Sequence, residues 1–229
     1  MRLSLILPVY NGCGELKRNF MPIYNKVVRH RDAEIIIAED GSHDCSKKIA
    51  TDLARLRNVR LISRRRRIGK GAAVCNAISV AKGDVIGYMD IDLAVPLRYV
   101  EMAVKKVEEG NRIVLGSRYA RGASTERSRS RLAESMLFNL MMRIFLGSRI
   151  SDHQCGFKFW DGRYIKRAIN RVKDRRWFFD SEILVRAQRD GIFPYELPVE
   201  WSEGSSTKVG RTDFLYFFGA ILKLRKELR

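Results

Sequence analysis

The sequence predicts an α/β protein with a mostly parallel sheet that is covered by helices on both faces. Short apolar runs alternate with stretches of helical length through the first half of the chain, and the runs contain few polar residues. Strands with this composition are typical of a sheet that is buried on both faces. A chain of 229 residues has room for one medium domain or two small ones, with a substantial core.

The first half is expected to contain five strands with four helices between them. The strands are expected at residues 3–7, 34–38, 59–62, 84–89 and 112–115. The helices are expected at about 15–28, 46–57, 71–81 and 96–109, with Asp44 or Ser46 as a cap and Pro96 in a first turn. Sheets of this kind bind ligands at the carboxyl ends of their strands. Polar residues at those ends are therefore the first candidates for a site.

The rhythm of the sequence changes near Ser117. The segments expected after it are an Arg/Ser-rich loop at 118–131, an apolar helix at 132–146, an irregular segment around 152–160, a helix near 179–189 and a strand at 195–201. We assign residues 1–210 to one domain. Residues 211–229 are expected to form a separate basic amphipathic tail helix.

The charge is the unusual part of the composition. Forty-four Lys and Arg against 26 Asp and Glu give a formal net charge of +18. Such a charge attracts nucleic acid, an anionic lipid surface or phosphate-rich small molecules, and does not choose among them. No RRM, KH or zinc-finger pattern is present, so nucleic acid is not an expected partner. The run 64–67, four arginines, is expected to be a solvated or lipid-facing edge.

The cysteine spacing and the hydropathy describe the expected compartment. The four cysteines, Cys13, Cys45, Cys75 and Cys155, include no C-x-x-C pair, and we expect thiols without a disulfide framework. The first apolar run is too short for a signal peptide, and no stretch approaches the roughly 18 apolar residues of a membrane span. We expect a chain in a reducing compartment that does not cross a bilayer.

Asp90 and Asp92 are the strongest chemical signal. They stand two residues apart directly after an expected strand, where unpaired carboxylates are costly. At a strand-to-loop turn both can approach one hard cation, and Mg²⁺ or Mn²⁺ suits one or two carboxylates together with substrate phosphates. An isolated pair of this kind is usually a solvated loop, but the position at a strand end favours a metal.

Two glycine-containing turns provide weaker signals. Asp40 precedes Gly41 at the end of the second expected strand, where it either accepts hydrogen bonds from a base or ribose or serves the turn and the following helix. Gly69-Lys70-Gly71 opens a helix whose N–H groups can approach a phosphate, although the P-loop spacing is absent. A tight connection is the alternative for this helix start.

The remaining titratable residues indicate no nucleophilic triad. The three histidines, His30, His43 and His153, are expected to be structural. Asp180 and Glu182 lie where a helix is expected to begin, and negative charge is favourable there without any catalytic role.

In their order along the chain, these motifs resemble the inverting family-two glycosyltransferases of the GT-A fold. The motifs are Pro8-Val9-Tyr10-Asn11, Asp40-Gly41-Ser42, Gly69-Lys70-Gly71-Ala72 and Asp90-Ile91-Asp92. Later stretches are similar to dolichyl-phosphate glucose and mannose synthases: residues 116–118, 152–158, 176–182 and 199–201, then 206–208. Residues 154–158 and 176–182 favour the glucose synthase. The resemblance covers about residues 3–210 and implies a Rossmann-like GT-A sheet.

The resemblance also implies roles for individual residues. The implied nucleotide-sugar pocket is lined by Pro8, Tyr10, Glu15, Asp40, Lys70 and Asp90. Asp90 and Asp92 would hold the pyrophosphate through Mg²⁺ or Mn²⁺. The acceptor phosphate would meet Arg118, Arg131, Ser206 and Lys208. The catalytic candidates are Asp92, Arg118, Asp152 and Asp180.

The implied reaction is inverting transfer of glucose or mannose from a nucleotide-sugar to a polyprenyl or dolichyl phosphate. It would occur at the cytoplasmic face of a membrane, with the chain bound peripherally and a membrane-protein partner conceivable. The helix at 132–146 is expected to dip into lipid through Met136, Leu140 and Met141, while the role of the tail stays open. A glycan or another lipid acceptor is the alternative, and nucleic-acid binding is a distant one.

Overall fold

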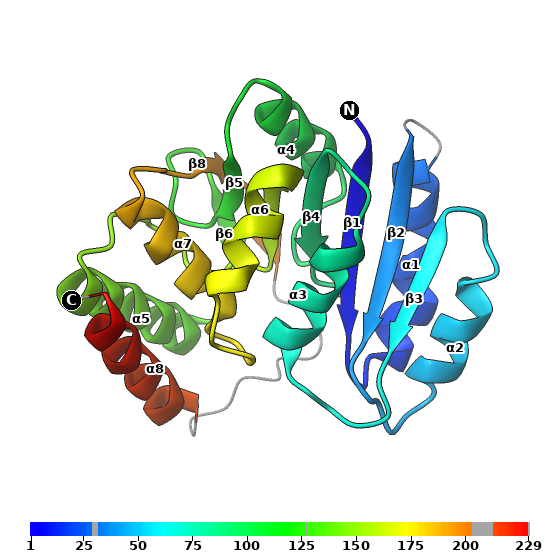
Figure 1. Ribbon diagram of the computed structural model, residues 1–229, viewed down its shortest axis with the longest axis horizontal. Helices are drawn as coiled ribbons and strands as arrows, with labels where there is room; N and C mark the ends of the chain where they lie inside the picture. Colours follow the sequence, from blue (N-terminus) through cyan, green and yellow to red (C-terminus); the bar gives the residue numbers. More distant parts are fainter. Residues whose placement is uncertain (29–31, 127, 203–212, 229) are drawn as a thin grey trace.

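A seven-stranded sheet with the order β3-β2-β1-β4-β7-β5-β8 forms the centre of the protein (Figure 1). The computed structural model describes residues 1–28, 32–126, 128–202 and 213–228. The strands are β1 (Leu3–Val9), β2 (Ala33–Glu39), β3 (Val59–Ser63), β4 (Val85–Met89), β5 (Ile113–Ser117), β7 (Phe157–Asp161) and β8 (Tyr195–Pro198). Neighbouring strands are parallel except at β7, which is antiparallel to β4 and β5. The prediction of a mostly parallel α/β sheet is confirmed.

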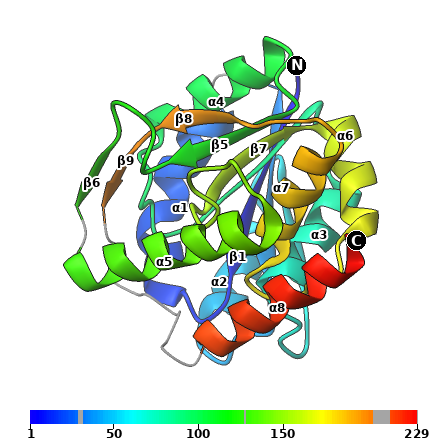
Figure 2. The same ribbon diagram turned by 90° about the vertical axis from the view of Figure 1, so that its left-hand side faces the viewer.

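Helices cover both faces of this sheet, as Figure 2 shows. One face packs on α1 (Cys13–Val28), α2 (Ser46–Leu53) and α4 (Arg98–Glu108). The other packs on α3 (Lys70–Val80), α6 (Gly162–Ala168, followed by a short 3₁₀ turn at Ile169–Arg171) and α7 (Phe179–Arg189). Along β1, Leu5 and Leu7 point to the first face and Ile6 to the second, so both faces of the strand are buried and apolar except at Ser4.

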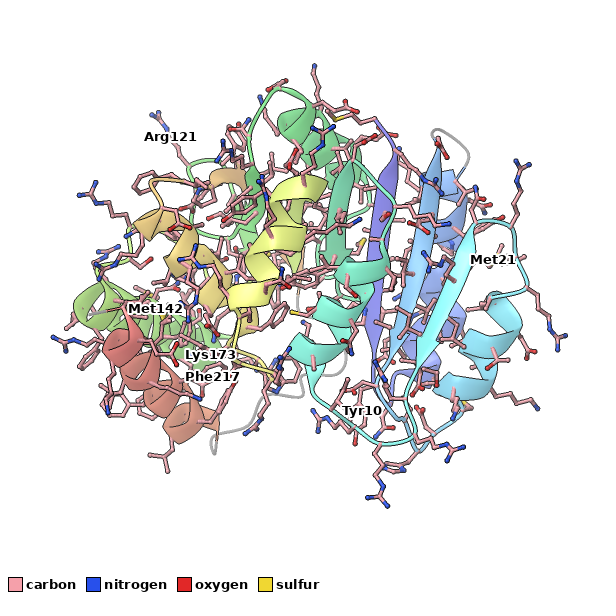
Figure 3. The ribbon with its side chains drawn as sticks, in the orientation of Figure 1. Tyr10, Met21, Arg121, Met142, Lys173 and Phe217 are labelled. Carbon is pink, nitrogen blue, oxygen red and sulfur yellow. A yellow bond between two sulfur atoms is a disulfide. The ribbon has the colours of Figure 1, made fainter. Side chains whose placement is uncertain are left out.

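A third layer lies beyond the second face. It consists of α5 (Arg129–Leu146) and α8 (Asp213–Glu227), which lie side by side in Figures 1 and 2. Phe217 of α8 and Met142 of α5 are buried where the two helices meet (Figure 3), together with Val185 of α7. The tail helix is thus packed on the domain. A two-stranded parallel sheet, β6 (Ser124–Glu126) with β9 (Glu200–Ser202), completes the fold.

The second half of the chain departs from the sequence-based expectation. The segment expected to be irregular contains β7, Phe157–Asp161. This strand was not predicted, because the charged Lys158 interrupts its apolar run. Lys158 is fully buried and donates hydrogen bonds to the carbonyl oxygens of His153 and Cys155. The expected strand at 195–201 is divided between β8 and β9, and α2 ends at Leu53, earlier than expected.

The cysteine prediction is wrong for one pair. Cys13 and Cys45 form a disulfide, with Cα atoms 5.4 Å apart. The two residues follow β1 and β2, which are adjacent and parallel, so the register of the sheet brings together loops that are distant in sequence. Cys75 and Cys155 are free and buried, as expected.

Candidate active site

The carboxyl ends of β1, β2 and β4 open into one pocket of about 500 Å³. Tyr10 lies just beyond the end of β1 (Figure 3). The pocket is lined by most of the residues that the sequence singled out: Pro8, Tyr10, Glu15, Asp40, Lys70, Asp90, Asp92, Arg118, Arg131 and Asp180. Asp152 lies behind the pocket wall, and Ser206 and Lys208 fall outside the described residues.

The floor of the pocket contains an ion pair. Lys70, the first residue of α3, places its Nζ 2.6 Å from Oδ1 of Asp90. The same ammonium lies over the ring of Tyr88 at 5.4 Å and over that of Trp177 at 5.2 Å. Burial lowers the pKa of Lys70, but the carboxylate of Asp90 and more distant acidic groups outweigh burial and raise it. Lys70 therefore stays protonated among acidic groups.

Asp92 is the second carboxylate of the floor. Its Oδ1 accepts a hydrogen bond from the main-chain N–H of Ala94 at 3.1 Å. Burial, followed by the charge of Asp90 and a smaller contribution from Glu15, raises the pKa of Asp92. The site thus crowds negative charges that Lys70 balances only in part.

This arrangement fits a divalent cation. A Cβ at Gly156 would collide with the carboxylate of Asp90, so the glycine lets this carboxylate pack against the main chain at the pocket floor. Among the described residues, no three His, Cys, Asp or Glu side chains gather to hold a metal by themselves. Two carboxylates completed by phosphate oxygens are what Mg²⁺ or Mn²⁺ accepts.

Asp40 holds the loop that precedes Lys70. Its two carboxylate oxygens accept hydrogen bonds from the main-chain N–H groups of Ile68 at 2.7 Å and Gly69 at 2.9 Å. Gly69 has φ +102°, and a Cβ there would meet the carbonyl oxygen of Arg175. Asp40 therefore positions the start of α3, and its expected contact with a base or ribose stays a prediction.

The start of α3 is a tight connection, one of the two alternatives for this segment. The N–H of Gly71 donates to the carbonyl oxygen of Arg176 at 2.8 Å, and that of Ala72 donates to Arg175 at 3.0 Å. These two groups already have partners within the chain. A phosphate in the pocket would meet the side chain of Lys70 rather than these amides.

Arg67 is a pocket residue that sequence reasoning missed. Its guanidinium lies 4.1 Å from the centroid of the Tyr10 ring, at the pocket wall. All four arginines of the run at 64–67 are exposed, so the expectation of a solvated edge agrees with the structure for the run as a whole. The signal that could have indicated a pocket position for Arg67 was its place in the sequence, two residues before Gly69.

Arg118 and Asp152 form a buried, bidentate pair. Nε and Nη2 of Arg118 lie 2.7 Å from Oδ2 and Oδ1 of Asp152, and the main-chain N–H of Arg118 also donates to Oδ2. Burial raises the pKa of Asp152, but the guanidinium outweighs burial and lowers it. Asp152 thus holds Arg118, which lines the pocket 5.5 Å from the ring of Trp201.

Asp180 is held in a comparable way at the start of α7. Its Oδ2 accepts hydrogen bonds from the Tyr88 hydroxyl at 2.5 Å and from Lys158 Nζ at 2.7 Å. Burial first, and then the charge of Asp180, raises the pKa of Tyr88 well above its usual value. Asp180 borders the pocket with both neighbours in place, as a fixed negative charge.

The side of the pocket opposite the strand ends is apolar. It consists of Phe138 and Met141 from α5, Phe214 and Phe217 from α8, and Trp177. The expectation that Met141 faces lipid is wrong, because Met141 is buried and lines the pocket. Arg131, also on α5, adds a positive charge to this side. The pocket therefore combines a charged floor with an apolar wall.

Comparisons with known proteins place this pocket in a family. The model of Glycosyl transferase family 2 matches residues 4–176. The chain is 35% identical over 217 residues to glycosyltransferase AglD of Haloferax volcanii, covering 91% of this chain and 34% of that protein. It is 30% identical to dolichyl-phosphate beta-glucosyltransferases of Trichomonas vaginalis and Dictyostelium discoideum, covering 90% of this chain and 68% of each relative. The chain thus spans about a third of the length of AglD.

Solved structures share the fold. A glucosyl-3-phosphoglycerate synthase of Mycobacterium tuberculosis, in complex with Mn²⁺, UDP-glucose and phosphoglyceric acid, aligns with a TM-score of 0.69. The alignment covers 97% of this chain and 78% of that chain at 14% identity. This likeness confirms the predicted GT-A architecture. The residues matched by the family model include the ends of β1, β2 and β4, which open into the pocket, and the Asp90 and Asp92 pair. The chain belongs to glycosyl transferase family 2.

Proposed function

We propose that the protein transfers a hexose, glucose or mannose, from a nucleotide-sugar to a polyprenyl or dolichyl phosphate with inversion at the sugar. The observation that carries the proposal is the composition of this pocket. A floor of paired carboxylates faces cationic side chains and an apolar wall. Two relatives named dolichyl-phosphate beta-glucosyltransferases, and a structural neighbour that contains UDP-glucose and Mn²⁺, support this proposal.

The donor would bind at the ends of β1, β2 and β4. Tyr10 and Arg67 form one wall there, and Lys70 supplies a cation for the diphosphate. A Mg²⁺ or Mn²⁺ ion held by Asp90 and Asp92 would act as a Lewis acid towards the leaving nucleoside diphosphate. Lys70 and Arg67 add positive charge on the same side of the pocket, where negative charge grows as the glycosidic bond breaks.

The acceptor would bind at the opposite side. Arg118, held rigid by Asp152, and Arg131 can grip a phosphate and align it with the anomeric carbon. A phosphate monoester with a second pKa of about 6 is largely ionised near neutral pH, so it attacks without a strong general base. The locked position of Asp180 agrees with that requirement, and Phe138, Phe214 and their neighbours offer contact to the first isoprene units.

We also propose peripheral attachment to the cytoplasmic face of a membrane. The outer surface of α5 and α8, termed the lipid face below, exposes Leu132, Met136, Leu137, Leu140, Ile144, Phe214, Leu215 and Leu222. Exposed basic residues accompany them: Arg143, Lys223, Arg225 and Lys226. None of the helices in the described part of the chain has the length and apolar character of a membrane span.

Replacement of Asp92 tests the reaction. We expect Asp92→Ala to reduce sugar transfer to a polyprenyl phosphate at least about a hundredfold, because it removes one of the two carboxylates of the site. Asp52→Asn, which changes an exposed carboxylate on α2, is the matched control and should leave transfer unchanged. Full activity of a folded Asp92→Ala protein would contradict the proposed metal site.

A second experiment separates the acceptors. One labelled nucleotide-sugar is offered with a polyprenyl phosphate, a diacylglycerol or a soluble glycan, and product is measured for each. We expect transfer to the phosphate alone, because the two arginines face the acceptor side of the pocket. Transfer to the glycan or the diacylglycerol would favour the alternative of a different acceptor on the same fold.

A further inference from the structure

Lys70 forms an ion pair with one of the two carboxylates that the proposed metal site requires. Its ammonium lies 2.6 Å from Oδ1 of Asp90 and so neutralises part of the negative charge at the floor of the pocket. The main chain at Lys70 is fixed on both sides: Gly69 donates to Asp40, and Gly71 donates to Arg176. Only the flexible four-carbon stem of Lys70 is then left to move.

Asp90 is the strongest partner of the ammonium, and the other groups around it bind a charge only weakly. The rings of Tyr88 and Trp177 flank it, and neither ring is a strong competitor for a charge. Asp90 is its one hydrogen-bond acceptor among the described residues. A diphosphate bound in the pocket that Lys70 lines would offer oxygens with more negative charge than Asp90.

We propose that Lys70 is a positioning residue that makes divalent-metal binding depend on the donor diphosphate, an inference that rests on the proposed function. With no diphosphate present, the ammonium pairs with Asp90, so an approaching cation meets one carboxylate and a repelling charge. A bound diphosphate draws the ammonium away and releases Asp90. By linkage, the metal tightens diphosphate binding by the same factor.

Metal binding measured without catalysis tests this inference. Mn²⁺ is titrated into the full chain, and free Mn²⁺ is read by electron paramagnetic resonance, alone and with saturating UDP or GDP. For the wild type we expect weak binding alone and at least roughly tenfold tighter binding with one of the two diphosphates. In Lys70→Gln, binding of Mn²⁺ alone should tighten by roughly tenfold, because a unit charge beside the site is removed, and the gain from diphosphate should shrink accordingly.

Two further variants separate occupancy of Asp90 from general charge. Lys70→Arg keeps a cation that reaches Asp90, and it should keep the weak metal-only binding of the wild type. Arg67→Gln removes a cation from the same pocket without touching Asp90, and it should leave metal-only binding close to wild type. Thermal melts of both variants accompany the binding measurements, so that a folding defect in either variant is detected.

The outcomes distinguish the two proposals. Equal tightening in Lys70→Gln and Arg67→Gln, or unchanged dependence on diphosphate in Lys70→Gln, would overturn the inference about Lys70 and leave the metal site standing. Failure of every protein to bind Mn²⁺ with either diphosphate would overturn both.

Discussion

Two lysine–aspartate pairs, both beside the ring of Tyr88, have nearly the same bond length and different surroundings. Lys70 and Asp90 are 2.6 Å apart, with 16% and 38% of their side chains exposed. Lys158 and Asp180 are 2.7 Å apart, with 0% and 8% exposed. Lys158 also donates to two main-chain carbonyl groups, whereas Lys70 has no such bonds among the described residues. The Lys70–Asp90 pair is therefore able to exchange partners, and the Lys158–Asp180 pair is structural.

The largest effect should come from breaking the structural pair. Lys158→Met leaves Asp180 and two carbonyl oxygens buried without their cation, and we expect the free energy of unfolding to fall by about 3–5 kcal/mol. Lys70→Met should change it by no more than about 1 kcal/mol, because solvent screens a pair whose aspartate is more than a third exposed. Urea unfolding of both variants measures the difference. Equal losses would show that the two pairs do not differ in kind.

The cysteines also differ between the two ends of the pocket. The Cys13–Cys45 disulfide ties the loop after β1 to the loop after β2, and Cys13 N–H also donates to Asp44. On the acceptor side, Cys155 is a thiol whose burial raises its pKa to about 12, so it is unreactive near neutral pH. A reductant is therefore expected to act on the donor side.

Reduction should lower stability by the entropy of one closed loop. For a sequence separation of 32 residues, we expect Cys45→Ser, or a dithiol reductant, to lower the free energy of unfolding by roughly 3–4 kcal/mol. Cys75→Ala is the matched control: it should keep its sensitivity to the reductant, which Cys45→Ser should have lost. Thermal melts with and without the dithiol measure both. A wild type that melts at one temperature under both conditions would contradict a stabilising role for the bond.

The contrast explains which parts of the site were predictable from sequence. The strand ends carrying Tyr10, Asp40 and Asp90 were predicted because apolar runs and their stops are local patterns, and because parallel strands end at one edge. The motif order identified the family. The roles of Asp152 and Asp180 could not be separated in advance, because Arg118 and Lys158 reach them only in the folded chain.

Pairings that depend on three-dimensional register were missed for the same reason. The segment around 152–160 was expected to be irregular, because the burial of Lys158 becomes possible only when the carbonyl groups of the preceding loop and Asp180 converge on it. Cys13 and Cys45 meet because β1 and β2 are adjacent, which spacing alone does not reveal. Met141 was assigned to lipid because helical periodicity does not say which apolar residues a second helix, α8, will cover.

His153, which lies beside Lys158, makes the stability of the protein depend on pH. Burial, and then the charge of Lys158, lowers the pKa of His153 from 6.5 to about 4. The unfolded chain therefore binds a proton that the folded chain refuses, so stability is present above pH 6.5 and is lost as the pH falls towards 4. The slope contributed is at most about 1.4 kcal/mol per pH unit. His153→Gln should flatten the pH dependence of unfolding in that window, and His43→Gln, which changes an exposed histidine, should not.

The smallest expected effect concerns the lipid face, where side chains contribute to binding and not to stability. Leu140 and Ile144 of α5 are 48% and 64% exposed, so Leu140→Asn with Ile144→Asn should change the free energy of unfolding by less than about 0.5 kcal/mol. The same double variant should weaken binding to anionic vesicles by roughly tenfold, because apolar area that would be buried in lipid is lost. Met102→Asn, at a residue 47% exposed on α4, is the matched control and should bind as the wild type does. Sedimentation with vesicles of mixed neutral and anionic lipid measures all three proteins, and raised salt should weaken each because the basic residues of the lipid face are screened. Equal binding by the double variant and the control would mean that α5 and α8 serve the pocket alone, and that attachment to a membrane has to come from another part of the protein.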